Sequence, residues 1–296
     1  MAKKRITNQS YNEQINLAMA HIHFNFGSNI KAEDLAKICG YSVFHFHRIF
    51  KEVTGENIND YIRNTRLEKA SNLLLYNQHQ TIEMISINSG FDSSSGFRRA
   101  FKKKFAITPN DWRKSGYESN DFNCPEAKKL MIKVDNDIDI GKPIIVNNEP
   151  IPMLFMLSYG YKDDMSSVWN HIYEWAELMN VLKEEHRFLG LFHNHPSFEP
   201  YDSARYVACV ETHNDVYRSG KVGTCVISEG KFAKFEFTCT HKELYKLMHL
   251  AYINWLPTSD YEVRNFPAYV EYKNPKELLN NGILECSFFM PIQLIV

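Results

Sequence analysis

Hydrophobic and polar positions near the N-terminus follow the 3.6-residue period of α-helices. On a helix that follows Ser42, one side is apolar and contains Phe46, Ile49, Phe50 and Val53. A shorter apolar pattern begins near Ala32 and ends before Gly40, which stands where a left-handed helix end is needed. Ser42 is a suitable N-cap for the second helix. The pattern therefore predicts a helix-turn-helix.

The same pattern returns about fifty residues later. Gly90 repeats Gly40, and the apolar stripe of the second copy contains Phe97, Ala100, Phe101 and Phe105. Arg99 follows Arg48 by 51 positions, whereas the two glycines are 50 apart, so we expect one extra residue in the second helix of the second copy. Ser93 or Asp92 would cap that helix. We predict two helix-turn-helix units, at about 32–53 and 81–104, joined by a helix over 58–76.

The pattern changes after a polar stretch at 116–127, which we predict to be a linker. Strand, helix, strand and strand are predicted at 153–158, 166–182, 188–192 and 206–210, with Met179 on the apolar side of the helix. The same order returns at about 232–237, 244–255, 269–272 and 286–290. This repetition predicts an α+β domain whose helices cover one face of an antiparallel sheet. The predicted fold is multidomain, with an all-α domain at 1–115 and an α+β domain at 128–296.

The sign of the net charge also changes between the two predicted domains. The residues through Ser115 include 17 Lys and Arg against 10 Asp and Glu, a net charge of +7. The residues from Gly116 onward include 17 against 25, a net charge of −8. A basic first domain beside an acidic second one indicates that the first meets a polyanion.

Several other classes of protein are disfavoured. No apolar run reaches the roughly 18 residues of a membrane span, and the start of the chain lacks the apolar segment of a secretory signal. The six cysteines stand singly, as expected for reduced thiols in a cytoplasmic protein. The pairs His45/His47 and His193/His195 lack the further ligands of a metal site. Without a phosphate-binding loop or a nucleophile elbow, we expect no cofactor and no enzymatic activity.

The first domain resembles the AraC/XylS family of transcription regulators. The resemblance rests on Leu35-Ala36 before Gly40-Tyr41-Ser42, on Gly90-Phe91, and on Thr108-Pro109 with Trp112-Arg113. It implies a monomeric unit that places two recognition helices in successive major-groove segments of double-stranded DNA. By position, the resemblance assigns base-facing roles to Phe44, His47, Arg48, Ser94, Ser95, Arg98 and Arg99.

The second domain resembles the GyrI-like effector-binding domain. The motifs are Trp169-x-x-Ile172-x-x-Trp175, Asn194-His195-Pro196 and Trp255-Leu256-Pro257. An AraC-type domain followed by this one resembles the arrangement of Rob-like regulators. The resemblance implies a cleft lined with aromatic side chains for a small apolar or aromatic effector. The residues expected near it are Tyr173, Tyr206, Trp255, Tyr269, Glu271 and Tyr272.

The chain departs from this family at one position. Relatives commonly carry a glutamate where this chain has Val270, and they use it to bind cations or, in some cases, for hydrolysis. Alternation along a strand turns the neighbouring Glu271 to the opposite face, unless a bulge intervenes. We therefore expect a transcription regulator, an activator that would also contact RNA polymerase. The alternatives are a small-molecule hydrolase or a ligand-sequestering protein with a vestigial DNA-binding domain.

Overall fold

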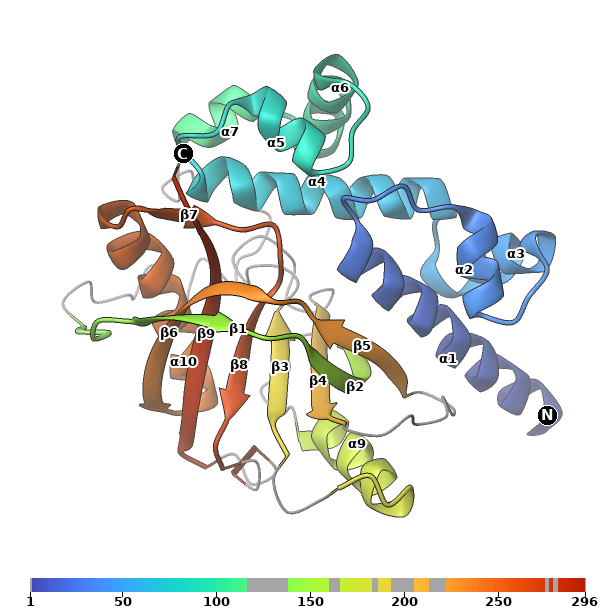
Figure 1. Ribbon diagram of the computed structural model, residues 1–296. Helices are drawn as coiled ribbons and strands as arrows, with labels where there is room; N and C mark the ends of the chain where they lie inside the picture. The colour runs from blue at the N-terminus through green and yellow to red at the C-terminus, as the bar shows by residue number, and fades with distance from the viewer. Residues whose placement is uncertain are drawn as a thin grey trace. The chain divides into compact units, whose positions relative to one another are not determined.

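A computed structural model describes residues 2–115, 138–159, 166–182, 186–192, 205–212, 222–274, 277–278 and 282–295. The chain divides into two compact units, one made of helices α1–α7 and the other containing strands β1–β9 (Figure 1). The predicted multidomain organisation, helical first and α+β second, is confirmed. The predicted linker at 116–127 lies outside the described residues, so the domain boundaries stay predictions.

Helix α4 is the axis of the first unit, with α2 and α3 near one end and α5 to α7 along the other (Figure 1). The helices are α1 (Ala2–Asn25), α2 (Ala32–Ile38), α3 (Val43–Thr54), α4 (Ile58–Tyr76), α5 (Ile82–Asn88), α6 (Ser94–Phe105) and α7 (Pro109–Ser115). Phe46, Phe50, Phe97 and Phe101 are fully buried, as the two apolar stripes require. The two predicted helix-turn-helix units and the connecting helix are confirmed.

The extra residue of the second copy lies in the turn and not in the helix, which corrects the sequence prediction. Helices α3 and α6 both contain 12 residues. Their N-caps are Ser42 and Ser93, whose hydroxyls accept hydrogen bonds from the backbone N–H groups of His45 and Gly96. Only the turn after Gly90 is longer, because Asp92 precedes the cap while Ser42 follows Tyr41 directly. The two recognition helices therefore match each other residue for residue.

Both recognition helices end on a residue in the left-handed conformation. Gly55 ends α3 with φ +80°, and Ala106 ends α6 with φ +64°. Each donates its backbone N–H to the carbonyl four residues earlier. Glycine adopts this conformation without steric cost, whereas the Cβ of alanine is strained there. The chain therefore places a strained residue at the end of α6.

We expect Ala106→Gly to raise the free energy of unfolding of the helical unit by about 0.5–1 kcal/mol. Gly55→Ala is the matched control, because a Cβ added at Gly55 would meet no other atom within 4 Å. It should lower stability by about 1 kcal/mol through backbone strain alone. Urea denaturation followed by far-ultraviolet circular dichroism measures both changes. A change in the free energy of unfolding of the same sign in both variants would contradict this account.

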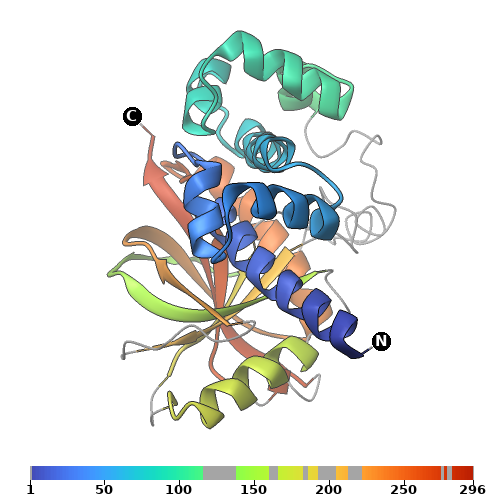
Figure 2. The ribbon, with the colours of Figure 1, turned by 90° about the vertical axis from the view of Figure 1, so that its right-hand side faces the viewer.

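The second unit is a curled antiparallel sheet with helices (Figure 2). Its first half contains β1 (Ile144–Asn148), β2 (Ile151–Tyr159), α9 (Ser166–Leu178), β3 (Phe188–Phe192), β4 (Arg205–Glu211) and β5 (Gly223–Ile227). The second half contains β6 (Gly230–Cys239), α10 (His241–Leu250), β7 (Tyr261–Val263), β8 (Ala268–Tyr272) and β9 (Leu284–Leu294). A π-helical turn, Ala251–Trp255, and a 3-10 turn, Leu256–Thr258, extend α10.

The strand order is β1-β6-β9-β8-β3-β4-β2-β5, with β7 paired to β9. The two repeats meet at the antiparallel pair β3 and β8, and the first three strands outward, β3-β4-β2 and β8-β9-β6, follow the same order in both repeats. This confirms the predicted duplication of strand, helix, strand and strand. The strands β1, β5 and β7, of three to five residues, were not predicted.

The register at the centre of the sheet decides which side chains share a face. Tyr272 pairs with Phe188, Val270 with Gly190, and Tyr206 with Phe192. Since paired residues and alternate residues of a strand share a face, all of these lie on one side, which we call the helix face. Helix α9 covers it, because the ring of Trp169 contacts those of Phe188, Tyr206 and Tyr272.

Helix α9 ends four residues earlier than predicted. Asn180 takes a left-handed conformation with φ +52°, and the N–H of Val181 returns to the carbonyl of Ala176. This is the hydrogen bond of a Schellman ending. Met179, expected on the apolar side of the helix, is 42% exposed as a result.

Candidate DNA-binding and ligand-binding sites

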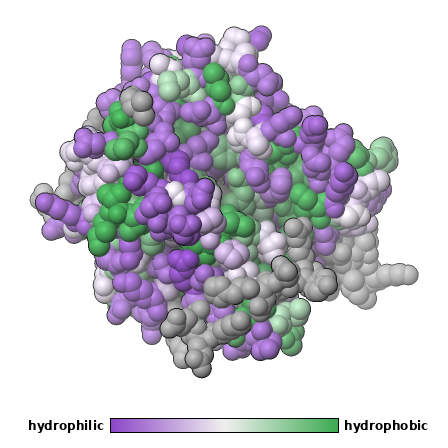
Figure 3. All heavy atoms as spheres, viewed as in Figure 1, coloured by the Kyte–Doolittle hydropathy of each residue, from purple (hydrophilic) through white to green (hydrophobic). Residues whose placement is uncertain are grey.

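Helix α3 presents the predicted base-facing residues to solvent. Phe44, His47 and Arg48 are all exposed, and Phe44 has 85% of its surface accessible. Figure 3 shows a hydrophobic patch at the tip of the helical unit, in the region of α2 and α3. An aromatic ring left in water at the start of a basic helix is unusual for packing reasons alone. It is suited to an apolar contact with a thymine methyl group.

Helix α6 presents an equivalent face. Ser95, Arg98 and Arg99 are exposed, and Ser94 is half-buried. The Nε of Arg98 donates to the hydroxyl of Ser94 across 3.4 Å. Arg99 stands 51 positions after Arg48, the same offset as the N-caps, so the two arginines occupy equivalent places on equivalent helices. The seven predicted residues thus form two clusters, three on α3 and four on α6, and all but Ser94 are exposed.

Arg66 of α4 binds the segment that follows α1 and packs against the turn of the second helix-turn-helix. Its guanidinium donates to the carbonyl oxygens of Phe26 and Ser28, each across 2.8 Å. A Cβ added at Gly90 would lie 2.8 Å from the Nε of Arg66 and 3.0 Å from the oxygen of Phe26. Glycine at the turn therefore allows both a positive φ of +82° and close packing on this arginine.

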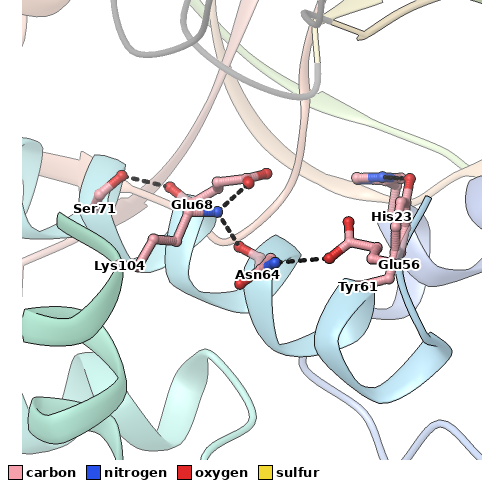
Figure 4. Close-up of polar contacts among 7 residues, drawn as sticks. All are labelled: His23, Glu56, Tyr61, Asn64, Glu68, Ser71 and Lys104. Atoms are coloured by element: carbon pink, nitrogen blue, oxygen red, sulfur yellow. Dashed lines mark hydrogen bonds and ion pairs between the residues drawn. The ribbon is translucent and has the colours of Figure 1, made fainter. Parts of the chain in front are cut away.

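A second set of polar contacts joins α6 to α4 (Figure 4). Lys104 forms an ion pair with Glu68 and donates to the carbonyl of Asn64 across 3.3 Å. The amide of Asn64 in turn donates to Glu56, which lies between α3 and α4, across 2.8 Å. Buried His23 and Tyr61 connect α1 to α4 with a 3.0 Å hydrogen bond. These contacts tie both recognition helices to the connecting helix and direct Lys104 toward protein.

In the second unit, three buried aromatic residues form a hydrogen-bonded chain on the helix face. The indole N–H of Trp169 donates to the hydroxyl of Tyr206 across 3.1 Å. That hydroxyl lies 3.2 Å from the hydroxyl of Tyr272. Burial raises the pKa of Tyr206 and of Tyr272, so both phenols stay neutral. These three hydrogen-bonded side chains place polar atoms inside an otherwise aromatic environment. Such an arrangement suits an aromatic ligand with few polar groups.

Gly190 makes room for the Tyr206 side chain in this hydrogen-bonded set. A Cβ added there would collide with the hydroxyl oxygen of Tyr206 and lie 2.8 Å from its Cζ atom. The φ of Gly190 is not positive, so the requirement is for space and not for backbone freedom. The tyrosine ring therefore lies directly over the backbone of the central strand β3.

Two other predicted ligand-binding residues lie on the same face at its two ends. The ring of Tyr173 stacks on Phe188 with centroids 6.2 Å apart. Trp255 meets Phe235 edge-on at 5.5 Å and stacks on Tyr261. Phe235 pairs with Phe288, which pairs with Val270, so this contact is also on the helix face.

Tyr269 and Glu271 lie on the opposite face of the sheet. Tyr269 is fully buried, stacks on Phe289 at 4.6 Å and accepts a hydrogen bond from Asn148. Glu271 is half-buried, and burial raises its pKa although Arg187 and Lys234 act in the other direction. The structure therefore does not bring these two residues together with Tyr206, Trp255 and Tyr272. Strand β8 has a regular register through Val270 and Glu271, without the bulge that would reunite them.

The sequence-based site omitted Trp169 and Gly190. Trp169 was a visible motif residue, but its helical spacing is that of any core position. Gly190 is needed because the side chain of Tyr206 from β4 lies over it. The pattern of residues along the sequence does not show which side chain of a neighbouring strand lies there. The Asn194-His195-Pro196 motif and His193 lie outside the described residues.

The described parts of the chain contain neither a metal-binding cluster nor a membrane-spanning helix. No three or more His, Cys, Asp or Glu side chains gather there in a way that would hold a metal ion. Within those same residues, no helix has the length and apolar character needed to span a membrane.

Two equivalent helix-turn-helix units on one connecting helix define a DNA-binding domain of the AraC type, here followed by a duplicated α+β domain. Residues 35–115 match the family model of a helix-turn-helix domain, and residues 142–293 match that of the GyrI-like small molecule binding domain. The second match covers more than half of the chain. The chain belongs to the GyrI-like small molecule binding domain family.

Individual relatives match a smaller part. The chain is 41% identical over 114 residues to the Right origin-binding protein of Escherichia coli (strain K12), covering 35% of this chain and 39% of that protein. It is 37% identical over 99 residues to the uncharacterized HTH-type transcriptional regulator YbfP of Bacillus subtilis (strain 168), covering 33% and 32%. The matches thus span about a third of these relatives. An AraC-type regulator structure from Chromobacterium violaceum is 26% identical, covers 34% of this chain and 90% of that one, and has a TM-score of 0.33.

Proposed function

We propose that this protein is a transcription regulator that reads double-stranded DNA as a monomer through helices α3 and α6. The observation that carries the proposal is the pair of equivalent, exposed arginines, Arg48 and Arg99, on two helices of equal length. An α-helix fits the major groove, and an arginine there can make a bidentate contact with guanine. Phe44, His47, Ser94, Ser95 and Arg98 complete the two reading faces, which would enter groove segments about one helical turn apart.

Selection of bound fragments from a random DNA pool by the full-length protein tests this proposal. We expect one extended site with two conserved segments whose centres lie about 10 base pairs apart. Affinity for that site should fall steeply with salt, because neutralised phosphates release counterions. A protein that enriches no sequence from the pool would contradict the proposal.

The second unit, in this proposal, takes up a small apolar or aromatic effector on the helix face, beside the Trp169–Tyr206–Tyr272 chain. Support comes from the concentration of aromatic rings there and from the match to a small molecule binding domain. Buried Val270 offers no charge beside Tyr272, so neutral compounds should bind better than cations of the same size. Effector binding would then change DNA occupancy or contact with RNA polymerase, and we propose that the regulator is an activator.

Tyr272→Ala should weaken binding of a neutral aromatic compound such as 2-naphthol by about tenfold or more, since buried tyrosines often dominate binding energy. Titration of the tryptophan fluorescence of the full-length protein measures the affinity. Tyr269→Ala is the matched control, because this tyrosine stands on the same strand but on the opposite face. Equal losses in the two variants, with both still folded, would contradict the assignment of the helix face.

We also propose that the protein is not an enzyme. A general base must reach the proton that it removes, and Glu271 faces away from the aromatic chain. Full-length protein should therefore hydrolyse activated esters no faster than background. Turnover that disappears in Glu271→Gln would favour the alternative of a hydrolase.

A further inference from the structure

The two recognition helices differ in how their equivalent arginines are held. An Nη2 N–H of Arg48 donates to the Nδ1 atom of His45, one helical turn earlier, across 3.2 Å. The position equivalent to His45 in α6 is Gly96, which has no side chain to offer. No hydrogen bond or ion pair of Arg99 is found in the described part of the chain. Arg48 is thus oriented before DNA arrives, and Arg99 is not.

The ring of His45 is itself held in place. Tyr41 meets it edge-on with centroids 5.0 Å apart, and Tyr11 of helix α1 meets it at 5.7 Å. The two tyrosines also contact each other, at 6.1 Å. The backbone N–H of His45 donates to the N-cap Ser42. Two ring contacts and the capped backbone fix the position from which the imidazole accepts its hydrogen bond.

We infer that His45 is a positioning residue that orients Arg48 for reading one base pair, and that it does so only as neutral imidazole. This inference rests on the proposed role of Arg48 in reading DNA. A guanidinium has only donors, so Nδ1 must be unprotonated and Nε2 must carry the ring proton. One Nη2 N–H is engaged, and the remaining N–H groups of Arg48 can still make a bidentate contact with guanine.

Protonation of His45 would reverse this arrangement. It converts the acceptor Nδ1 into a donor and places a positive charge beside the guanidinium, so Arg48 is released. The other titratable groups that face the ring are the phenols of Tyr11 and Tyr41, and burial raises the pKa of Tyr41. No carboxylate of the described residues pairs with His45. Sequence preference at the base pair that Arg48 reads should therefore fall as the pH falls, while attraction to phosphates persists.

The test measures base preference with the full-length protein and its selected site. Arg48→Ala and Arg99→Ala first identify the base pair that each arginine reads. It is the base pair at which the substitution relaxes sequence preference. Sequence preference at the base pair read by Arg48 should be about three- to tenfold lower at about pH 5.5 than at about pH 8. Preference at the Arg99 pair is the internal control and should stay within about twofold. His47→Gln removes the other histidine of the reading face and should leave this pH response in place.

Two substitutions at His45 separate positioning from packing. His45→Gln keeps an acceptor that does not titrate, so preference at the Arg48 pair should stay high and become independent of pH. His45→Phe keeps the aromatic contacts and removes the acceptor, so preference there should be low at every pH. Unchanged preference at the Arg99 pair shows that each variant is folded. His45→Phe with wild-type preference at pH 8 would overturn the inference, whereas Arg48→Ala without effect on any base pair would overturn the proposed role of Arg48.

Discussion

Arg48→Ala and Arg99→Ala should each weaken binding to the selected DNA site by about 1–3 kcal/mol and relax preference at one base pair. Both side chains are exposed in the free protein, so truncation removes little packing. The expected loss is that of a bidentate contact with guanine. Competition gel shifts of the full-length protein, on sites that differ at single positions, measure the loss and the position together.

A phosphate contact predicts a different result for the same variants. Binding would weaken about evenly across sequences, and the slope of log affinity against log salt would shrink by about one. Lys104→Ala is the useful comparison, because this lysine is on the same helix as Arg99 but pairs with Glu68 of α4. It should not relax preference at a single base pair. Arginine variants that leave both affinity and salt slope unchanged would contradict the reading role.

The helical unit was predictable from sequence because its signals are local. Caps, turn glycines and 3.6-residue stripes act within a few residues, and α4 begins and ends at the predicted positions. The extra residue was misplaced for the same reason. Aligned motifs show an offset of one between the copies, but they do not show whether the helix or the turn absorbs it. Cap hydrogen bonds at Ser42 and Ser93 place it in the turn.

The ligand-binding residues were harder to predict, because a sheet brings together residues from distant strands. Alternation along the strand predicted that Glu271 turns away from Val270, and the register of β8 confirms it; Tyr269, also expected near the cleft, lies on the same face as Glu271, opposite Tyr272. The contacts among Trp169, Tyr206 and Tyr272 span 103 positions of the chain. No periodicity encodes such contacts. The orientation of Arg48 by His45, in contrast, joins residues one turn apart on α3 and depends on tyrosines from two other segments.

Gly190→Ala should strongly destabilise the second unit. The added Cβ would collide with the Tyr206 hydroxyl and crowd its ring, with Cζ at 2.8 Å and Cε2 at 2.9 Å. Tyr206 is fully buried, so its ring has no room to withdraw without disturbing Trp169 and Tyr272. Overpacking of this kind costs about 1–3 kcal/mol of unfolding free energy. Binding of 2-naphthol should be lost at the same time, if the hydroxyl chain contacts the ligand as proposed.

A double-mutant cycle with Tyr206→Phe separates this collision from a general loss of packing. Tyr206→Phe alone removes a buried hydroxyl and its hydrogen bonds to Trp169 and Tyr272, at a cost of about 1–3 kcal/mol. In the double variant the atom that the Cβ meets first is absent, so the two costs should sum to more than the measured loss. Urea unfolding of the full-length proteins, followed by tryptophan fluorescence, gives the three free energies. Strictly additive costs would show that the cost of the added methyl group does not come from the Tyr206 hydroxyl, which would contradict this account.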